Sequence, residues 1–196
     1  MPEVPIYTDV NSAIIERCKK GERRAFQELY TLYAKAMFNI SLRIVNNTGE
    51  AEEVLQDSFL KAFEKIGSYD PKYAFGAWLK RIVINGSLDA LKKKKLVLLP
   101  LDELQHAQEE DNGSNNYWEE MGVDVETIKK CVTELPDGYR TILSLFLFED
   151  YSHKEIAKLL GINEGTSKSQ YSRAKKKLIE LVIKTSVNER SAKKIR

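Results

Sequence analysis

The segment YSHKEIAKLLGINEGTSKSQYSRAKKKL, residues 151–178, carries the signals of two short helices joined by a tight turn. Ser152 and Glu155 stand three residues apart, which is the pattern of a capping box at the start of a helix. Gly161 suits the left-handed turn that ends the first helix, and Asn163 suits the N-cap of the second. This spacing predicts a helix-turn-helix.

The second helix of this motif is basic on the side that faces away from its core. Residues 166–178 contain five Lys or Arg and no acid, and hydroxyl side chains lie at the N-terminal end, where a recognition helix meets base edges or phosphates. We therefore predict DNA binding, with a plain solvated helix as the alternative. The expected core side carries Tyr171, Ala174, Leu178 and Leu181. The candidate DNA-binding residues are Thr166, Ser167, Lys168, Ser169, Ser172, Arg173 and Lys176.

Helical periodicity continues through most of the chain. Apolar residues recur every three or four positions, and no run alternates for long enough to indicate a strand. Thr48 is available as the cap of the second helix, and Pro136 suits a first helical position. The helical runs occupy residues 25–44, 50–66, 74–94, 125–135 and the stretch after Pro136.

An acidic connector separates two basic blocks. Residues 96–128 hold nine acids and no Lys or Arg, whereas residues 1–95 hold 16 basic and 12 acidic residues and residues 129–196 hold 15 and 8. This asymmetry indicates nucleic-acid binding and a tethered architecture, with segregated solvated faces as the alternative. Low hydrophobicity without periodicity over residues 102–124 predicts a flexible linker. The expected fold is all-α: two small helical domains joined by a flexible acidic linker, the second containing the helix-turn-helix.

Several classes of protein are not expected. The N-terminus MPEVPIYTDV lacks the features of a secretory signal, and no apolar stretch approaches the roughly 20 residues of a membrane span, so we expect a cytoplasmic protein without direct membrane insertion. Cys18 and Cys131 are far apart and near neither histidine, which predicts buried cysteines rather than a metal site or a disulfide. Without a catalytic constellation or a phosphate loop, we expect neither an enzyme nor a cofactor.

The helix expected over residues 50–66 has an acidic face. Its core side carries Ala51, Val54, Leu55, Phe59, Ala62 and Ile66. Its other side carries Glu53, Gln56, Asp57, Leu60 and Glu64. An acidic face that includes a leucine suits docking to a basic partner surface better than contact with DNA. An ordinary solvent-exposed face is an equal alternative.

Three motifs in this order resemble bacterial sigma factors of the extracytoplasmic-function (ECF) type. They are EAEEVLQDSFLKAFEKI (50–66), FGAWLKRIVINGSLDALKKKK (75–95) and ELPDGYRTILSLFLFEDYSHKEIAKLLGINEGTSKSQYSRAKKKL (134–178). The resemblance covers residues 12–95 as region 2 and 125–183 as region 4, with 96–124 as the acidic linker. It implies an initiation factor that binds core RNA polymerase and directs promoter-specific transcription.

The resemblance also implies functional residues in the first domain. The family's contact with the coiled coil of the polymerase beta-prime subunit matches Glu53, Gln56 and Asp57. Its minus-ten region matches residues 67–95, with the loop 67–75 near an extruded non-template base and Trp78 in the core. In that region the resemblance assigns DNA contact to Asn85, Asp89, Lys92, Lys93 and Lys94. A bond between Asn85 and Asp89 inside the domain is the alternative for those two.

In the second domain, the family's minus-thirty-five motif matches residues 151–178. We expect Lys168, Arg173 and Lys176 to hold phosphates, and Thr166, Ser167 and Ser169 to lie near base edges. Gln170 stands where many relatives have arginine, which puts one phosphate or base contact in question. Asn163 stands where many have serine, and asparagine caps a helix equally well.

The partners implied by the resemblance are core RNA polymerase, through its beta-prime coiled coil and its beta flap, and promoter DNA. The family commonly has an anti-sigma factor, and its connector between regions threads toward the RNA exit path. The rival interpretation is an autonomous helix-turn-helix regulator with an N-terminal helical interaction domain. The basic end of the third helix counts against that rival, and the recognition helix counts against an adaptor without a DNA role.

Overall fold

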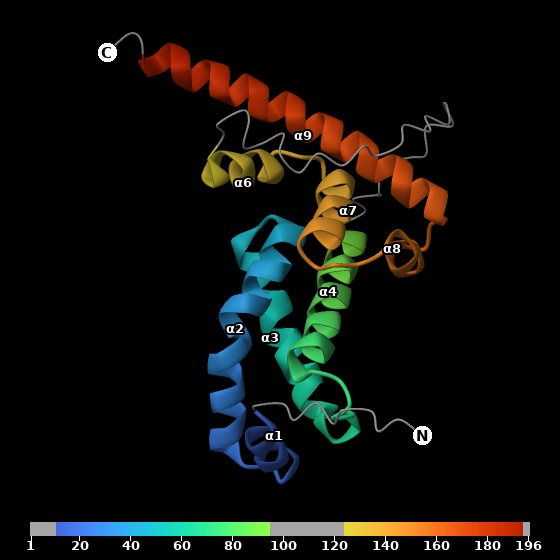
Figure 1. Cartoon of the computed structure of the whole chain (residues 1–196). Helices are drawn as coiled ribbons and strands as arrows, with labels where there is room; N and C mark the ends of the chain where they lie inside the picture. Colours follow the sequence, from blue (N-terminus) through green and yellow to red (C-terminus); the bar gives the residue numbers. More distant parts are fainter. Residues whose placement is uncertain (1–10, 95–123, 194–196) are drawn as a thin grey trace, which may run out of the picture. The chain divides into compact units, whose positions relative to one another are not determined.

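The computed structural model describes residues 11–94 and 124–193, with side chains described as far as residue 186. All regular structure in these ranges is helical, which confirms the all-α prediction. The chain divides into two compact units, Met1–Leu96 and Val97–Arg196, and each is described by itself (Figure 1). The predicted linker, apart from its last residue, lies outside the described residues, as does Lys95.

In unit 1, three long helices pack against one another and a short helix precedes them. The periodic runs over 25–44, 50–66 and 74–94 form helices within two residues of the predicted bounds. The second run ends in a single turn of 3-10 helix before the loop. The helices of this unit are α1 (Ser12–Lys19), α2 (Arg23–Val45), α3 (Thr48–Glu64), η1 (Ile66–Ser68) and α4 (Phe75–Lys93).

The turn between α2 and α3 differs from the prediction in its cap. Asn46 takes a left-handed conformation with φ 54°, which ends α2 and leaves Asn47 extended. Asn47 Oδ1 then accepts from the Glu50 N–H at 3.0 Å. Thr48, predicted as the cap, is already the first helical residue, because the left-handed residue before Asn47 moves the cap one position earlier.

Small side chains let the helices of unit 1 approach closely. Ser87 Oγ of α4 lies 3.1 Å from Ser41 Oγ of α2, and both residues are fully buried. Around this crossing the core is apolar, with Phe75, Leu79, Val83 and Ile84 at 0% exposure. Trp78, predicted to be a core residue, is only half-buried, because it packs at the edge of this core on the rings of Tyr69 and Phe75.

Unit 2 consists of three short helices and one long helix that packs against all of them. Pro136 was predicted to be the first residue of its helix. It is instead the N-cap, and the helix begins one residue later, at Asp137. Arg140 is 2% exposed; it donates to Leu135 O at 2.8 Å and pairs with Asp137, which fixes the preceding turn. The helices are α6 (Val125–Thr133), α7 (Asp137–Leu147), α8 (His153–Leu160) and α9 (Glu164–Lys193).

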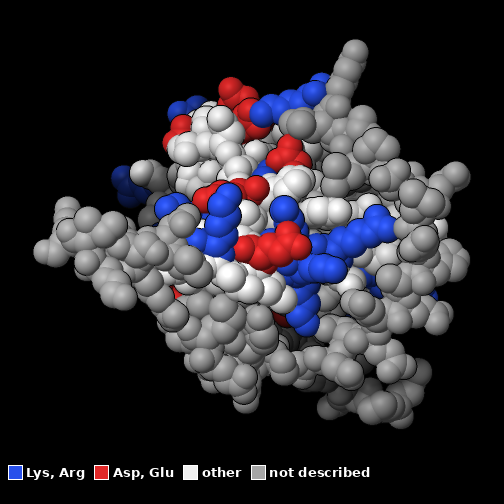
Figure 2. Space-filling view, turned by 90° about the horizontal axis from the view of Figure 1, so that it is seen from above, with Lys and Arg blue, Asp and Glu red and all other residues white. Residues whose placement is uncertain are grey.

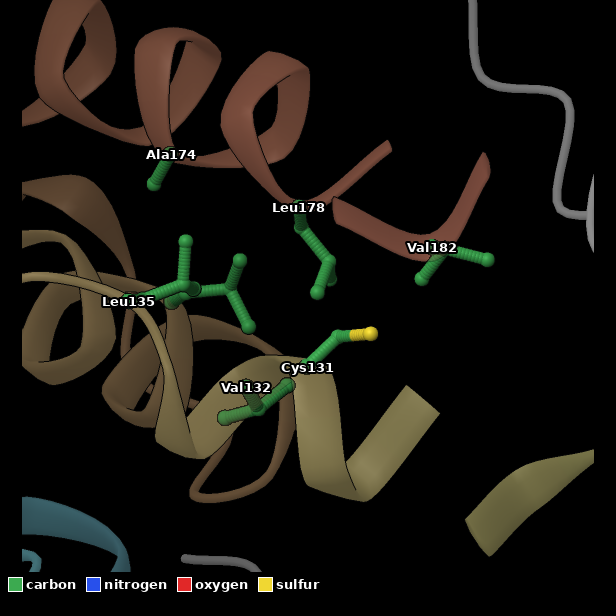
Figure 3. Close-up of a cluster of buried hydrophobic side chains, with 7 residues drawn as sticks. Cys131, Val132, Leu135, Ala174, Leu178 and Val182 are labelled. Atoms are coloured by element: carbon green, nitrogen blue, oxygen red, sulfur yellow. The ribbon is translucent and has the colours of Figure 1, made fainter. Parts of the chain in front are cut away.

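A hydrophobic cluster holds α9 against α6 and the turn that follows it. Figure 3 shows side chains from the two elements pointing toward one another. Ala174, Leu178 and Val182 recur every four residues along α9, so they lie on one face of the helix. Tyr171, Ala174 and Leu178 are buried as predicted, and Leu181 is half-buried. The buried members of the cluster are Cys131, Val132, Leu135, Leu143, Ala174, Leu178 and Val182.

Both cysteines are free and buried, as the sequence predicted. Burial raises the pKa of the Cys18 thiol to about 11. Among the described residues, no helix combines the length and the apolar character needed to cross a bilayer.

Candidate functional site

The helix-turn-helix forms as its sequence predicts. At the start of α8 the Ser152 N–H donates to Glu155 Oε2 at 2.9 Å, and the Glu155 N–H donates to Ser152 Oγ at 3.3 Å, which completes the capping box. Gly161 has φ 71°, the left-handed conformation that favours glycine. The Thr166 N–H donates to Asn163 Oδ1 at 2.6 Å, so Asn163 caps α9.

The outer side of α9 carries most of the predicted DNA-binding residues. Lys168 and Lys176 are exposed, and the remaining side chains on this side are half-buried. Ser169 Oγ donates to Thr166 O at 3.1 Å, so this hydroxyl is already bonded to the helix backbone. The half-buried residues are Thr166, Ser169, Ser172 and Arg173.

Acidic side chains lie among the basic ones near α9. Glu164, just before the basic segment, pairs with Lys168 at 2.8 Å, and this hydrogen bond holds the pKa of the Glu164 carboxyl below its ordinary range. Lys177 pairs with Glu180 at 3.2 Å. Figure 2 likewise shows Lys and Arg side chains interspersed with carboxylates on one face of the molecule. DNA phosphates would therefore compete with Glu164 for Lys168.

Two residues of the recognition helix are not where the sequence predicts. Ser167, expected near base edges, is 0% exposed, and its hydroxyl lies 3.0 Å from His153 Nδ1. A side chain without exposed surface has no access to a base edge, so this assignment is corrected. Gln170 is 9% exposed, so the glutamine side chain itself offers little surface for a phosphate or base contact. Both residues are buried within unit 2, and Ser167 lies against α8 through its contact with His153.

The predicted acidic face of α3 is exposed. Glu53, Gln56 and Asp57 reach solvent, as does Leu60 with 61% exposure. The opposite side is buried as predicted: Ala51, Val54, Leu55, Phe59, Ala62 and Ile66. Beside the acidic face, α2 and α3 border a shallow groove of about 390 Å³. It is lined by Tyr30, Ala34, Lys35, Phe38, Glu52, Leu55 and Gln56.

The C-terminal half of α4 presents the predicted minus-ten residues to solvent. Asn85 and Asp89 are both exposed, which contradicts the alternative that they bond each other inside the domain. The Asp89 carboxylate instead forms an ion pair with Lys92, with Oδ1 and Nζ 4.0 Å apart. Lys94 forms an ion pair with Glu50 at the start of α3, a long-range contact that no local pattern indicates. Lys92 and Lys93 are exposed.

The loop before α4 contains an exposed aromatic residue that sequence analysis missed. Tyr73 is 67% exposed, while the hydroxyl of Tyr69, itself buried, donates to Tyr73 O at 2.5 Å. The Lys72 N–H donates to Asp70 Oδ1 at 3.0 Å, which closes the turn. The signal available in the sequence was an aromatic residue in a polar loop between two helices. In the described part of the chain, acidic, histidine and cysteine side chains nowhere gather in a group able to hold a metal ion.

The chain has two helical units, and one of them contains a helix-turn-helix with a basic second helix. These features are typical of a DNA-binding protein that acts in transcription. Family models match both units: "Sigma-70 region 2" over residues 29–97 and "Sigma-70, region 4" over residues 125–178. The chain belongs to the ECF type of RNA polymerase sigma factors. Sigma factors are initiation factors rather than enzymes, so the rival interpretation as an autonomous regulator is not favoured.

Relatives named as sigma factors are similar to this chain over most of its length. The ECF RNA polymerase sigma factor SigW of Bacillus subtilis (strain 168) is 31% identical over 176 residues, covering 84% of this chain and 92% of SigW. The ECF RNA polymerase sigma factor SigM of Mycobacterium tuberculosis (strain ATCC 25618 / H37Rv) is 30% identical over 177 residues, covering 87% of this chain and 84% of SigM. The RNA polymerase sigma-H factor of Pseudomonas aeruginosa is 28% identical over 171 residues, covering 83% and 88%.

Two solved structures share the fold. One is CnrH in complex with the cytosolic domain of CnrY, with a TM-score of 0.51 at 22% identity, covering 89% of this chain and 97% of that one. The other is the sigma factor RpoE in complex with the anti-sigma factor NepR from Bartonella quintana. Its TM-score is 0.52 at 24% identity, and the match covers 80% of this chain and 96% of RpoE.

Proposed function

We propose that the two units divide the work of promoter recognition. Residues 12–95 act as region 2, which docks on core RNA polymerase and reads the minus-ten element, and residues 125–183 act as region 4, which reads the minus-thirty-five element. The family matches over residues 29–97 and 125–178 support these limits. The acidic segment 96–124 connects the two, and the protein works in the cytoplasm, where its polymerase is.

The polymerase-docking site is the exposed side of α3. Glu53, Gln56 and Asp57 lie within about one helical turn and reach solvent, while Val54 and Leu55 between them are buried. This single observation carries the assignment, because it gives the chain an acidic surface whose backbone is held rigid by its own core. A basic surface on the polymerase coiled coil is the complementary partner.

The minus-ten site combines the loop before α4 with the outer side of α4. Asn85 and Asp89 supply polar groups for bases, and Lys92 and Lys93 supply charge for phosphates. Lys94 serves this role only after it leaves Glu50. Tyr73, with 67% of its surface exposed, adds an aromatic ring on which an unpaired base stacks.

The minus-thirty-five site is the outer side of α9. Lys168, Arg173 and Lys176 hold backbone phosphates, and Thr166, Ser169 and Ser172 lie toward base edges. Ser167 is left out of this surface because it is buried. The capped start of α9 supports the assignment, since an ordered helix N-terminus presents both hydroxyls and backbone N–H groups to DNA.

An anti-sigma factor is the regulator that this proposal includes. The sigma factor RpoE was solved in complex with the anti-sigma factor NepR, and CnrH in complex with the cytosolic domain of CnrY. A protein of that kind would hold the chain away from polymerase. Co-purification of the chain from its own cells, with the bound proteins identified, tests for such a complex.

The decisive experiment compares DNA binding with and without polymerase. Each unit alone meets few base pairs, so the free protein should bind promoter duplex weakly until core enzyme brings both units to one promoter. Gel-shift titration at physiological salt should show a sequence-specific complex only after core enzyme is added. A tight complex on a palindromic site without polymerase would instead support the autonomous regulator.

A further inference from the structure

A partly buried polar contact joins the two helices of the helix-turn-helix. His153 Nδ1, in the first turn of α8, lies 3.0 Å from Ser167 Oγ in the first turn of α9. Ser167 has 0% exposure, although its neighbour Lys168 is exposed. A buried hydroxyl without a partner is costly, and the imidazole provides that partner. The contact therefore specifies how α9 lies against α8.

The imidazole is itself held by aromatic rings from two other helices. The His153 ring stacks on Phe146 of α7, with centroids 4.5 Å apart and an interplanar angle of 18°. It also meets Tyr171 of α9 edge-on at 5.5 Å, and Tyr171 packs on Phe146 at 4.5 Å. Because α7, α8 and α9 all meet at this one ring, His153 has little freedom to turn away from Ser167.

This contact lies directly beneath the proposed DNA-reading residues. Thr166 and Ser169 occupy the same turn of α9 as Ser167, and the Ser169 hydroxyl bonds back to Thr166 O at 3.1 Å. Recognition groups must be held within about 0.5 Å of their productive positions to discriminate between bases. A rotation of this turn would therefore move both reading residues at once.

We propose that His153 is a positioning residue for promoter selectivity: through Ser167 it holds the first turn of α9 in the orientation that Thr166 and Ser169 need to read the upstream element. The inference rests on the proposed assignment of α9 to the minus-thirty-five element. His153 and Ser167 act from inside unit 2, and neither touches DNA.

Two complementary substitutions separate the hydrogen bond from the stacking. His153→Phe keeps a stacked ring and removes the bond, whereas His153→Asn places an amide nitrogen near the position of Nδ1 and removes the ring. Ser167→Ala removes the hydroxyl from the other side. Thr133→Ala is a control for removal of a hydroxyl elsewhere in unit 2, because the exposed Thr133 hydroxyl, bonded to Lys130 O at 2.7 Å, lies on α6 outside the helix-turn-helix.

The assay uses the full chain bound to core polymerase and a promoter library randomised over the upstream element. Selectivity is the ratio of binding to the preferred sequence over a scrambled one. His153→Phe and Ser167→Ala should each lower this ratio about 3- to 10-fold, the range for loss of one buried hydrogen bond. The double variant His153→Phe/Ser167→Ala should lose no more selectivity than either single variant, since both substitutions break the same contact. His153→Asn should be more selective than His153→Phe, because its amide can still bond to Ser167.

The controls separate this inference from the function on which it rests. A merely structural role would lower the melting temperature and weaken binding to all sequences together, leaving the ratio unchanged. If Lys176→Ala weakens DNA binding while both single variants keep wild-type selectivity, the positioning role is wrong and the DNA site stands. If Lys176→Ala has no effect, the proposed site on α9 fails. If His153→Phe does not fold, Ser167→Ala decides by the same criterion.

Discussion

Gly86 of α4 lies directly against Ser58 of α3: a Cβ built at position 86 would be 3.1 Å from Ser58 Oγ and 3.3 Å from Val54 Cγ1. This close approach joins the helix with the acidic face to the helix with the proposed minus-ten residues. Because Val54 and Ser58 are themselves buried, they have little room to yield. The proposed polymerase-docking surface and the proposed minus-ten surface therefore belong to one compact unit.

A large side chain at position 86 should destabilise unit 1. We expect Gly86→Leu to lower the free energy of unfolding by about 1–3 kcal/mol, the usual cost of overpacking, and to weaken polymerase docking as α3 shifts. Thermal and urea unfolding measure the first effect. Gly67→Leu is the control, because nothing lies within 4 Å of a Cβ at position 67. Equal stability of the two variants would contradict the close packing.

Removal of the polar groups from the α3 surface should abolish tight docking without unfolding the helix. The variant Glu53→Ala/Gln56→Ala/Asp57→Ala should lose several kcal/mol of affinity for core polymerase, since these side chains project away from the buried side of α3. Circular dichroism should show unchanged helix content. The double variant Glu126→Ala/Glu180→Ala removes exposed acids from unit 2 and should bind normally. Wild-type affinity in the triple variant would refute the assignment.

Phosphate and base contacts on α9 should respond differently to substitution. Lys176→Ala in the polymerase complex should weaken binding to all upstream sequences about equally and reduce the salt dependence by roughly one unit of slope. Ser169→Ala should change the preferred sequence instead, with little change in the slope. Both are read from titrations at several salt concentrations on a promoter library. A uniform loss of affinity in Ser169→Ala would mean that this residue reads no base.

Asp124 should make the start of α6 sensitive to acid. Its carboxylate accepts from the Thr127 N–H and the Thr127 hydroxyl, each at 2.9 Å, and these bonds lower the pKa of Asp124 below its ordinary value of 3.8. A lowered folded-state pKa contributes stability that is complete above pH 3.8 and is lost as pH falls through the folded-state value.

Asp124→Asn tests this linkage, because asparagine also caps a helix but does not titrate. The stability difference between wild type and Asp124→Asn should be constant above about pH 5 and shrink as pH falls below 3.8. Thermal unfolding across this range measures it. Asp124→Ala should be less stable than wild type at pH 7. A difference that grows on acidification would have the wrong sign for this cap.

The sequence by itself determined the helices, the helix-turn-helix and the family. The helices and their caps depend on interactions between residues at most four positions apart, such as the Ser152–Glu155 capping box and the bond from Thr166 to Asn163, so local patterns are sufficient to predict them. The family was predicted from three motifs that occur in the expected order along the chain. The exposed face of α3 was predictable for the same reason, since Val54, Leu55 and Phe59 mark its buried side. The error at Thr48 was of one residue, because two adjacent asparagines compete for the end of one helix and the cap of the next.

Only the tertiary structure decided which polar residues reach solvent and which pair across helices. Ser167 and Gln170 lie in a basic helix, yet both are buried within unit 2, and Lys94 of the basic run pairs with Glu50 of another helix. A helical wheel gives the direction in which a side chain points but not the width of the surface that its neighbours cover. That width depends on where α7 and α8 cross α9, and the stacked His153 ring lies at this crossing.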